Sequence, residues 1–251
     1  MIKLIKRKLQ KSLRKRGLIG TVTFSVRSTL RHIGELSPGM RRKRQRIRDA
    51  EHAFDKTYNV DTSGVIPLSE LNIDGIGWQS GNAYQAVWPS EFHDAMRFAG
   101  VVANDLTFID FGCGKGRAIL LAAEYPFAKI VGVELSSELA QVAEKNIQSY
   151  RNPRQLCFNL NVVNEDATEL TLPDEPLVIF LYNPFECELM EVFIQNVELS
   201  IAHSPRNITI IYLNPQHDEL WKAVPNLAHV GRNSNVSVYN YKPDELADDE
   251  P

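Results

Sequence analysis

Residues 108–117 read Phe-Ile-Asp-Phe-Gly-Cys-Gly-Lys-Gly-Arg, and this stretch decides the fold of the chain. An apolar run leads into three alternating glycines, Gly112, Gly114 and Gly116, and residues 117–125 have a helical pattern. Glycine lets the backbone turn sharply and lets a ligand approach without a Cβ in the way. A strand that turns in this way into a helix, whose N-terminus favours an anionic group, predicts a ligand site at the carboxyl end of the strand.

The rest of the chain repeats this order of strand and helix. Helical patterns cover residues 49–58, 92–99, 117–125, 136–150, 189–201 and 217–224. Buried strands are predicted at residues 107–111, 129–134, 157–163, 177–182 and 208–213, with a closing hairpin at 228–231 and 236–241. Alternation of this kind implies right-handed crossovers between parallel strands. The predicted fold class is therefore α/β: a Rossmann-like, mostly parallel seven-stranded sheet with helices on both faces, a C-terminal antiparallel strand and a basic helical N-terminal arm.

Composition excludes several classes of protein. No apolar stretch approaches the roughly 18 to 20 residues that a membrane span requires. The three cysteines, Cys113, Cys157 and Cys187, are far apart and odd in number, which argues against a disulfide framework and favours a reducing cytoplasm. The six histidines are scattered singly, so no metal site is predicted.

The glycine turn carries a resemblance to a known family. Its spacing, Asp-x-Gly-x-Gly-x-Gly from Asp110 to Gly116, differs from the Gly-x-Gly-x-x-Gly of dinucleotide-binding proteins. It resembles the nucleotide-binding turn of the class I, Rossmann-like S-adenosylmethionine-dependent methyltransferases. Residues 54–66, Phe-Asp-Lys-Thr-Tyr-Asn-Val-Asp-Thr-Ser-Gly-Val-Ile, together with this turn resemble a group of largely uncharacterised bacterial members of that family.

The resemblance implies S-adenosylmethionine as the cofactor and a role for particular residues. Glu134 ends the second strand, at the family's position for holding the ribose hydroxyls. Asp166 follows the third strand, where an acid faces the adenine amino group, and Glu165 could take that part instead. The cofactor contacts implied in this way are Asp110, Phe111, Gly112, Cys113, Gly114, Gly116, Glu134, Leu135, Asp166, Ala167 and Asn183.

The segment Asn183-Pro-Phe185 bears on the methyl acceptor. It resembles the [N/D]-P-P-[Y/F] motif of amino-group methyltransferases but has one proline where that motif has two. The resemblance implies that Asn183 and Phe185 line the transfer site, whereas a plain turn at the end of a strand would explain the same residues. Tyr84 lies in a stretch that covers the cofactor in similar enzymes, so the predicted catalytic residues are Asn183, Phe185 and Tyr84.

These residues together predict a methyltransferase with an unidentified acceptor. Nitrogen, in a protein lysine or another amine, is preferred over oxygen, and Glu91 and Glu186 are candidate bases by position only. One alternative is an inactive S-adenosylmethionine-binding module that its basic arm tethers to nucleic acid or membrane. Another is a nucleotide-sugar or NAD-dependent enzyme, which the glycine spacing disfavours.

Charge divides the chain into unequal parts. Residues 1–48 hold 16 of the 28 Lys and Arg residues and one acid, so they carry +15 while the remainder carries −18. Such an arm could lie on an anionic membrane, bind nucleic-acid phosphates, or fold back on the acidic body; its helical apolar spacing favours the membrane surface. We expect a cytoplasmic protein, peripheral at a membrane. Its predicted parts are an amphipathic or partly disordered arm at 1–48, a helical cover at 49–100, a methyltransferase core at 101–242 and an acidic tail at 243–251.

Overall fold

The computed structural model describes residues 49, 52–67, 71, 82–233 and 235–243. The predicted basic arm and all but the first residue of the predicted acidic tail lie outside the described residues. The described residues from Ala53 onward belong to one compact unit. The candidate site is built within this unit.

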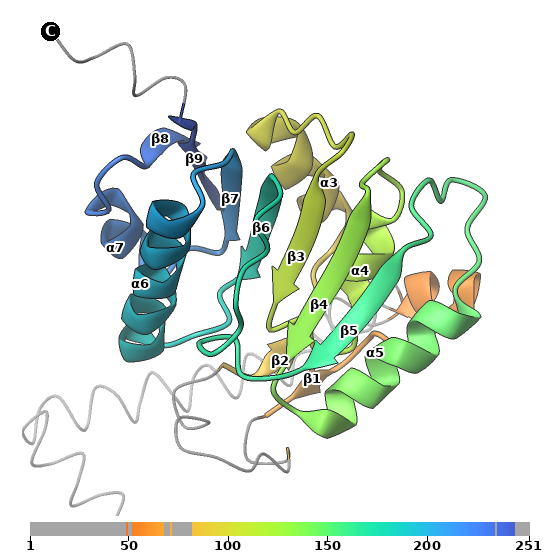
Figure 1. The fold of residues 1–251 in the computed structure, drawn as a ribbon. Helices are drawn as coiled ribbons and strands as arrows, with labels where there is room; N and C mark the ends of the chain where they lie inside the picture. The colour runs from red at the N-terminus through yellow and green to blue at the C-terminus, as the bar shows by residue number, and fades with distance from the viewer. Residues whose placement is uncertain (1–48, 50–51, 68–70, 72–81, 234, 244–251) are drawn as a thin grey trace, which may run out of the picture. The chain divides into compact units, whose positions relative to one another are not determined.

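A seven-stranded sheet forms the centre of this unit, in the order β5-β4-β3-β6-β7-β9-β8 (Figure 1). The strands from β5 to β7 are parallel, and β9 pairs antiparallel with β7 and β8. Their bounds are β3 Thr107–Phe111, β4 Lys129–Glu134, β5 Leu160–Asn164, β6 Leu177–Tyr182, β7 Ile208–Leu213, β8 Ala228–Arg232 and β9 Val236–Tyr241. The predicted fold class is confirmed for the sheet.

The third predicted strand begins later than the sequence indicated. The apolar residues from Cys157 onward predict a strand, but β5 begins at Leu160. The backbone N–H groups of Leu156 and Cys157 donate to the carbonyl of Ala123, the C-cap residue of helix α4 (Arg117–Ala122), instead of to β4. Burial of Cys157 under that helix therefore accounts for its apolar character.

Helices cover both faces of the sheet, as predicted. One face packs against α3, α4 and α5, and the other packs against α6 and α7 (Figure 1). Their bounds are α3 Pro89–Ala99, α4 Arg117–Ala122, α5 Ser137–Ser149, α6 Cys187–His203 and α7 Asp218–Lys222, and residues 52–58 are also helical. Within the described part of the chain, no helix has both the length and the apolar character to cross a membrane.

Successive residues of a strand serve the two different cores. In β3, Phe108 packs beneath α3, where its ring lies 6.0 Å from that of Phe92. Phe111, on the other face, lies 4.7 Å from the ring of Phe193 in α6. This alternation follows from the pleat of the strand, and it explains why a run that is apolar throughout marks a strand covered on both faces.

A short antiparallel hairpin lies at the carboxyl edge of the sheet. It pairs β1, Val65–Ile66, with β2, Tyr84–Gln85. In Figure 1 the two strands lie beyond the arrowheads of β4 and β5. The hairpin was not predicted from the sequence, because two-residue strands carry no periodic signal.

Candidate functional site

A cavity of about 340 Å³ lies at the carboxyl edge of the parallel strands, beside β2. This is the place where the glycine turn predicts a ligand, because the loops that follow parallel strands meet at one edge. Nine of the predicted site residues line it: Tyr84, Gly112, Gly114, Glu134, Leu135, Asp166, Ala167, Asn183 and Phe185. The structure therefore brings together residues from the ends of four strands and from the hairpin.

The other four predicted residues are not part of the described lining. Phe111 points into the core beneath α6, and Asp110 is buried within β3. The sulfur of Cys113 points toward Gly132 of β4, where an added Cβ would lie 2.7 Å from it. Gly116 packs on α5, because a Cβ there would lie 3.1 Å from that of Ala143. Within the turn, Gly112 and Gly114 therefore line the cavity, whereas Cys113 and Gly116 pack against neighbouring elements.

Glu134 is fixed by backbone donors on both sides. Its Oε2 accepts a hydrogen bond from the N–H of Gly114 at 2.8 Å, and its Oε1 accepts one from the N–H of Ser136, also at 2.8 Å. Burial raises the pKa of Glu134, and these backbone bonds oppose the rise. The carboxyl group therefore ties the glycine turn to the start of α5, where the Ser136 hydroxyl caps the helix.

Asp110 is a second carboxyl group buried in this region. Burial, and to a smaller extent the charge of Glu134, raises the pKa of Asp110 to about 8. Two neighbouring carboxylates cannot both ionise easily in a region of low polarity. Asp110 therefore keeps its proton at neutral pH, whereas a cation bound nearby would favour its release.

Two more acids follow β5. The Oδ1 of Asp166 accepts hydrogen bonds from the N–H and the hydroxyl of Thr168 at 2.8 and 2.7 Å. Its Oδ2 has no hydrogen bond from the described residues. Glu165 also lines the cavity, but it is exposed, whereas Asp166 is half-buried. We call the group formed by Glu134, Glu165 and Asp166 the carboxylate end of the cavity.

Asparagines dominate the opposite side of the cavity. Asn183 and Asn214 directly follow β6 and β7, both with a left-handed backbone, at φ values of 46° and 51°. Asn82, just before β2, donates from Nδ2 to the carbonyl of Asn183 at 2.9 Å and from its backbone N–H to that of Pro184 at 3.1 Å. We call the group formed by Asn82, Asn183 and Asn214 the amide end of the cavity.

A buried tyrosine orients the side chain of Asn183. The Tyr212 hydroxyl accepts a hydrogen bond from the N–H of His217 at 3.3 Å and donates to the Oδ1 of Asn183 at 3.0 Å. Because a hydroxyl has a single proton, the bond from His217 leaves that proton for Asn183. The side-chain oxygen of Asn183 is thereby held toward Tyr212, and its amide plane is set.

The two predicted aromatic residues occupy different positions. Phe185 lines the cavity next to Asn183, and its ring lies 5.5 Å from that of Phe193 in α6. The ring of Tyr84 lies against Gly114, since a Cβ at that glycine would collide with it. The Tyr84 hydroxyl donates to the carbonyl of Thr62 at 2.5 Å, and burial raises its pKa. Tyr84 therefore shapes the cavity with its ring, and its hydroxyl is bonded elsewhere.

Neither candidate base is among the described residues of the cavity lining. Glu91 accepts a hydrogen bond from the side chain of Asn235 at 3.3 Å, and burial raises its pKa. Glu186 is the N-cap residue of α6. Among the described residues, no group of three or more His, Cys, Asp or Glu side chains could hold a metal ion.

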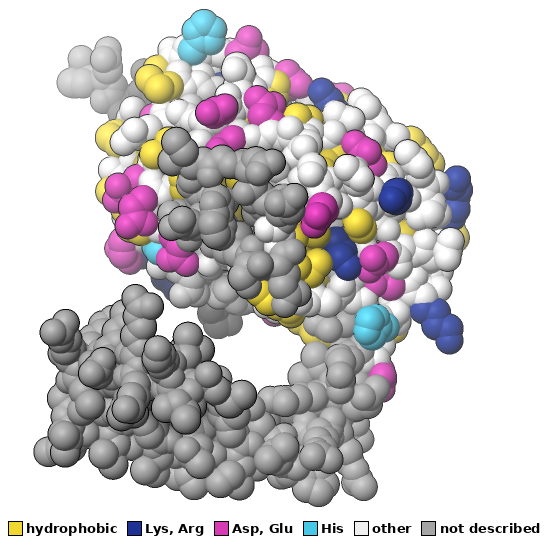
Figure 2. All heavy atoms as spheres, turned by 90° about the horizontal axis from the view of Figure 1, so that it is seen from below, with side chains coloured by type: hydrophobic (Ala, Val, Ile, Leu, Met, Phe, Trp, Pro, Cys, Tyr) yellow, Lys and Arg dark blue, Asp and Glu magenta, His cyan; other side chains and the backbone are white. Residues whose placement is uncertain are grey.

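The charge of the cavity has one sign. The carboxyl side chains among the described lining residues are those of Glu134, Glu165 and Asp166, and no Lys, Arg or His is among them. Figure 2 shows the molecule from this side, where Asp and Glu side chains are spread over the described part of the surface and some Lys and Arg side chains lie among them. A ligand of this cavity is therefore expected to be neutral or positively charged where it meets the protein.

Several lining residues were missed by the sequence reasoning. They include Leu71, Asn82, Gln85, Leu139, Leu189 and Asn214. One signal could have found Asn214: the pair Asn214-Pro215 follows β7 just as Asn183-Pro184 follows β6. The others belong to loops, to the short strand β2 and to helix starts that only the fold brings to the cavity.

The comparisons with known proteins concern this region. Residues 108–197 match the family model described as a methyltransferase domain. A putative methyltransferase, yhhF, from Escherichia coli has a similar structure, with a TM-score of 0.51 and 17% identity over 71% of this chain and 99% of that chain. The likeness at this identity shows the fold.

Two further structures match less closely. Magnesium protoporphyrin IX methyltransferase from Synechocystis PCC 6803, with bound SAM, has 12% identity and a TM-score of 0.42 over 61% of this chain and 77% of that chain. An RNA methyltransferase from Salinibacter ruber, in complex with S-adenosyl-L-homocysteine, has 15% identity and a TM-score of 0.42 over 62% of this chain and 92% of that chain. A search among curated proteins found no match.

Proposed function

We propose that this chain is a class I S-adenosylmethionine-dependent methyltransferase that transfers a methyl group to a nitrogen acceptor, in a protein lysine or another amine. The match of residues 108–197 to the model of a methyltransferase domain supports the proposal. The observation that carries the proposal is the cavity in which a carboxylate end and an amide end meet beside the glycine turn. The two ends have different chemistry, as a site for a cofactor and an acceptor requires.

The residues of the carboxylate end fit S-adenosylmethionine. Glu134 uses one lone pair of each oxygen on a backbone N–H and keeps others for hydroxyl donors such as those of a ribose. Asp166 offers Oδ2 to an amino group. Leu135 and Ala167 add apolar surface for a planar base, and about 340 Å³ lies within the range of small-molecule sites. The acidic lining also suits a cofactor with a positively charged sulfur.

The amide end is suited to hold and orient an amine. When bound, the cofactor supplies a methyl group on a sulfonium, so the protein must chiefly align the acceptor and exclude water. The Oδ1 and the backbone carbonyl of Asn183 each accept one hydrogen bond from the protein and can accept a second from an acceptor N–H. Phe185 supplies an apolar wall beside them.

Charge favours an amine over an anionic acceptor. The carboxylates of the lining would repel an acceptor carboxylate or phosphate and would attract an ammonium group. An ammonium must lose its proton before it can accept a methyl group, and water or a carboxylate can take that proton.

Labelled methyl transfer tests this proposal. We would supply S-adenosylmethionine with a labelled methyl group to the full chain and a fractionated cell lysate. We expect label that survives mild alkali, which cleaves methyl esters, and that is recovered as a methylated amine after acid hydrolysis, which distinguishes it from a methyl ether. The Asn183→Ala variant should label about a hundredfold more slowly, while its affinity for S-adenosylmethionine changes less than about threefold.

Three outcomes would overturn parts of the proposal. Label that alkali releases would exclude a nitrogen acceptor but keep the methyltransferase activity. Calorimetry that detects binding of NAD and none of S-adenosylmethionine would exclude the activity itself. An Asn183→Ala variant that labels at the wild-type rate would remove the amide end from the transfer site.

The role proposed for the basic arm rests on sequence alone. We infer that residues 1–48 hold the protein on an anionic membrane surface, because Ile2, Ile5, Leu9 and Leu13 keep helical spacing among Lys and Arg residues. Deletion of residues 1–48 should abolish sedimentation with vesicles that contain anionic lipid and should leave cofactor affinity unchanged. Equal sedimentation of both proteins would refute the inference, and binding of the arm to RNA instead would point to a nucleic-acid tether.

A further inference from the structure

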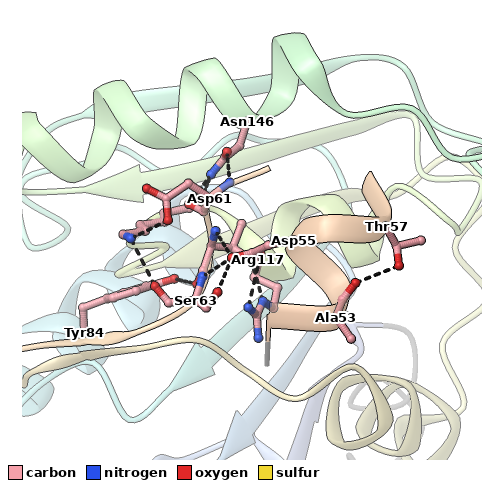
Figure 3. Close-up of polar contacts among 10 residues, drawn as sticks. Ala53, Asp55, Thr57, Asp61, Ser63, Tyr84, Arg117 and Asn146 are labelled. Carbon is pink, nitrogen blue, oxygen red and sulfur yellow. Dashed lines mark hydrogen bonds and ion pairs between the residues drawn. The ribbon is translucent and has the colours of Figure 1, made fainter. Parts of the chain in front are cut away.

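Residues 53–66 run along the glycine turn as a strap that ends in β1. Three side chains of the core hold it (Figure 3). Asn146 of α5 accepts from the N–H of Asp61 and donates to its carbonyl, both at 2.8 Å. Lys115, within the turn, donates to the carboxylate of Asp61 at 2.8 Å and to the carbonyl of Ser63 at 3.1 Å.

The third side chain is Arg117, which follows the last glycine of the turn. Its side chain is 1% exposed, and its Nε donates to the hydroxyl of Thr62 at 2.6 Å. Its Nη2 lies 3.4 Å from the carboxylate of Asp55, and its guanidinium packs over the ring of Phe54. A buried arginine costs free energy unless its charge is paired. Movement of the strap away from Arg117 would leave that charge unpaired, so the pairing holds the strap in place.

Asp55 closes the same network from within the strap. Its carboxylate accepts from the N–H of Thr62 at 3.0 Å, from the N–H of Ser63 at 2.7 Å and from both of their hydroxyls. Burial alone would raise the pKa of Asp55, but these bonds outweigh it and lower the pKa. The carboxylate therefore stays charged opposite Arg117 and shapes residues 55–63 into a closed loop.

The strap reaches the cavity through Tyr84. The carbonyl of Thr62 accepts the hydrogen bond from the Tyr84 hydroxyl, and β1 pairs with β2, which carries Tyr84. The Tyr84 ring lies against Gly114, whose N–H binds Glu134. A continuous chain of contacts thus links Arg117 and Asp55, which do not line the described cavity, to the residues that do.

We propose that Arg117, Asp55 and Thr62 are positioning residues for cofactor binding, which act by holding the Tyr84 ring against the glycine turn. The inference rests on the proposed function, since it concerns the same site. It also gives a role to the Asp-Thr-Ser segment at 61–63, which the cofactor contacts themselves leave unexplained.

Isothermal calorimetry with S-adenosylmethionine on the full-length chain tests the inference. The Thr62→Val variant keeps the shape of the side chain but removes the hydroxyl that joins Arg117 to Asp55. We expect its affinity to be about tenfold weaker, whereas Thr62→Ser, which keeps the hydroxyl, should bind within about twofold of the wild type. Tyr84→Phe should also weaken binding, and the double variant Thr62→Val, Tyr84→Phe should be no weaker than the worse single variant, because both act on one path.

A matched control separates this role from general loss of stability. Asp218 is also a buried carboxylate that binds a hydroxyl and a guanidinium, with Tyr239 at 2.6 Å and Arg232 at 2.8 Å, but it does not line the described cavity. Asp218→Asn should lower the melting temperature as Asp55→Asn does, yet leave cofactor affinity within about twofold. Asp55→Asn, by contrast, should weaken cofactor binding. Equal loss of cofactor affinity in Asp55→Asn and Asp218→Asn, or wild-type affinity in Thr62→Val, would overturn the inference.

Hydrogen exchange distinguishes this inference from the proposed function. Thr62→Val should speed amide exchange in a peptide that covers residues 82–86, with no cofactor present, whereas Asp218→Asn should not. A wild-type chain that binds no S-adenosylmethionine would refute the proposed function. Unchanged exchange at residues 82–86 in Thr62→Val would refute the strap whatever the cofactor result.

Discussion

The two ends of the cavity are held in place by different means. At the carboxylate end, backbone N–H groups of nearby turns bind the acids, as Gly114 and Ser136 do for Glu134. At the amide end, side chains from other parts of the chain bind Asn183, and Asn82 lies 101 residues away from it in sequence. Backbone donors thus fix the cofactor side, and side-chain donors fix the side that we assign to the acceptor.

This difference predicts how each end responds to change. A backbone donor cannot be removed by substitution of a side chain, so the carboxylate end should be sensitive chiefly to changes in the turn itself. The amide end depends on individual hydroxyl and amide groups, which single substitutions delete. The substitutions below test this contrast.

We expect the largest effect from Gly114→Ala. The residue has a left-handed backbone, with φ of 55°, and its added Cβ would collide with the Tyr84 ring. Affinity for S-adenosylmethionine should fall by about a hundredfold or more in calorimetry. Gly100→Ala is the control, since Gly100 has a similar φ of 63° with no atom within 4 Å of the added Cβ. Gly100→Ala should lower the free energy of unfolding by about 1 kcal/mol and leave the affinity for S-adenosylmethionine unchanged. Equal losses of affinity in Gly100→Ala and Gly114→Ala would show that the collision with Tyr84 has no role.

Asp110→Asn should change how stability depends on pH. The pKa of Asp110 is about 8 in the folded protein, against an ordinary value of 3.8, so the folded state binds the proton more tightly than the unfolded state. This group therefore lowers wild-type stability as the pH rises from about 4 to about 8. Relative to the wild type, the variant should gain up to about 5 kcal/mol of stability across that interval in urea unfolding, since each pKa unit corresponds to about 1.4 kcal/mol. If the free energies of unfolding of the wild type and Asp110→Asn differed by the same amount at all pH values, the raised pKa of Asp110 would be contradicted.

Tyr212→Phe tests the amide end. The variant loses the hydroxyl that orients Asn183 and that accepts from the N–H of His217. We expect a loss of about 1 kcal/mol of stability and a methyl-transfer rate about fivefold lower, with cofactor affinity unchanged. A fall in cofactor affinity instead would show that the two ends are not independent.

The smallest effect should separate the two acids after β5. Asp166 is half-buried and held by Thr168, whereas Glu165 is exposed. Asp166→Asn should weaken S-adenosylmethionine binding by about threefold, and Glu165→Gln should leave it unchanged. The reverse result would assign the adenine contact to Glu165.

Local patterns predicted much of the fold. The strands at residues 107–111, 129–134, 177–182 and 208–213 have the predicted bounds, because strands buried on both faces are apolar throughout. The start of β5 was wrong, since Cys157 is buried by contact with a helix and not by strand pairing. Apolar character reports burial, and it does not report the partner that causes it.

The sequence by itself determined the order of the elements, the glycine turn, the acid that ends β4 and the acids that follow β5, because each depends on residues close together in the chain. Only the tertiary structure decided which residues meet around the cavity. It placed Gly116 and Cys113 in packing contacts, set Asn82 and Tyr212 on Asn183, and bound Asp55 to Arg117. These pairings join positions far apart in sequence, and their geometry depends on the packing of the whole sheet and its helices.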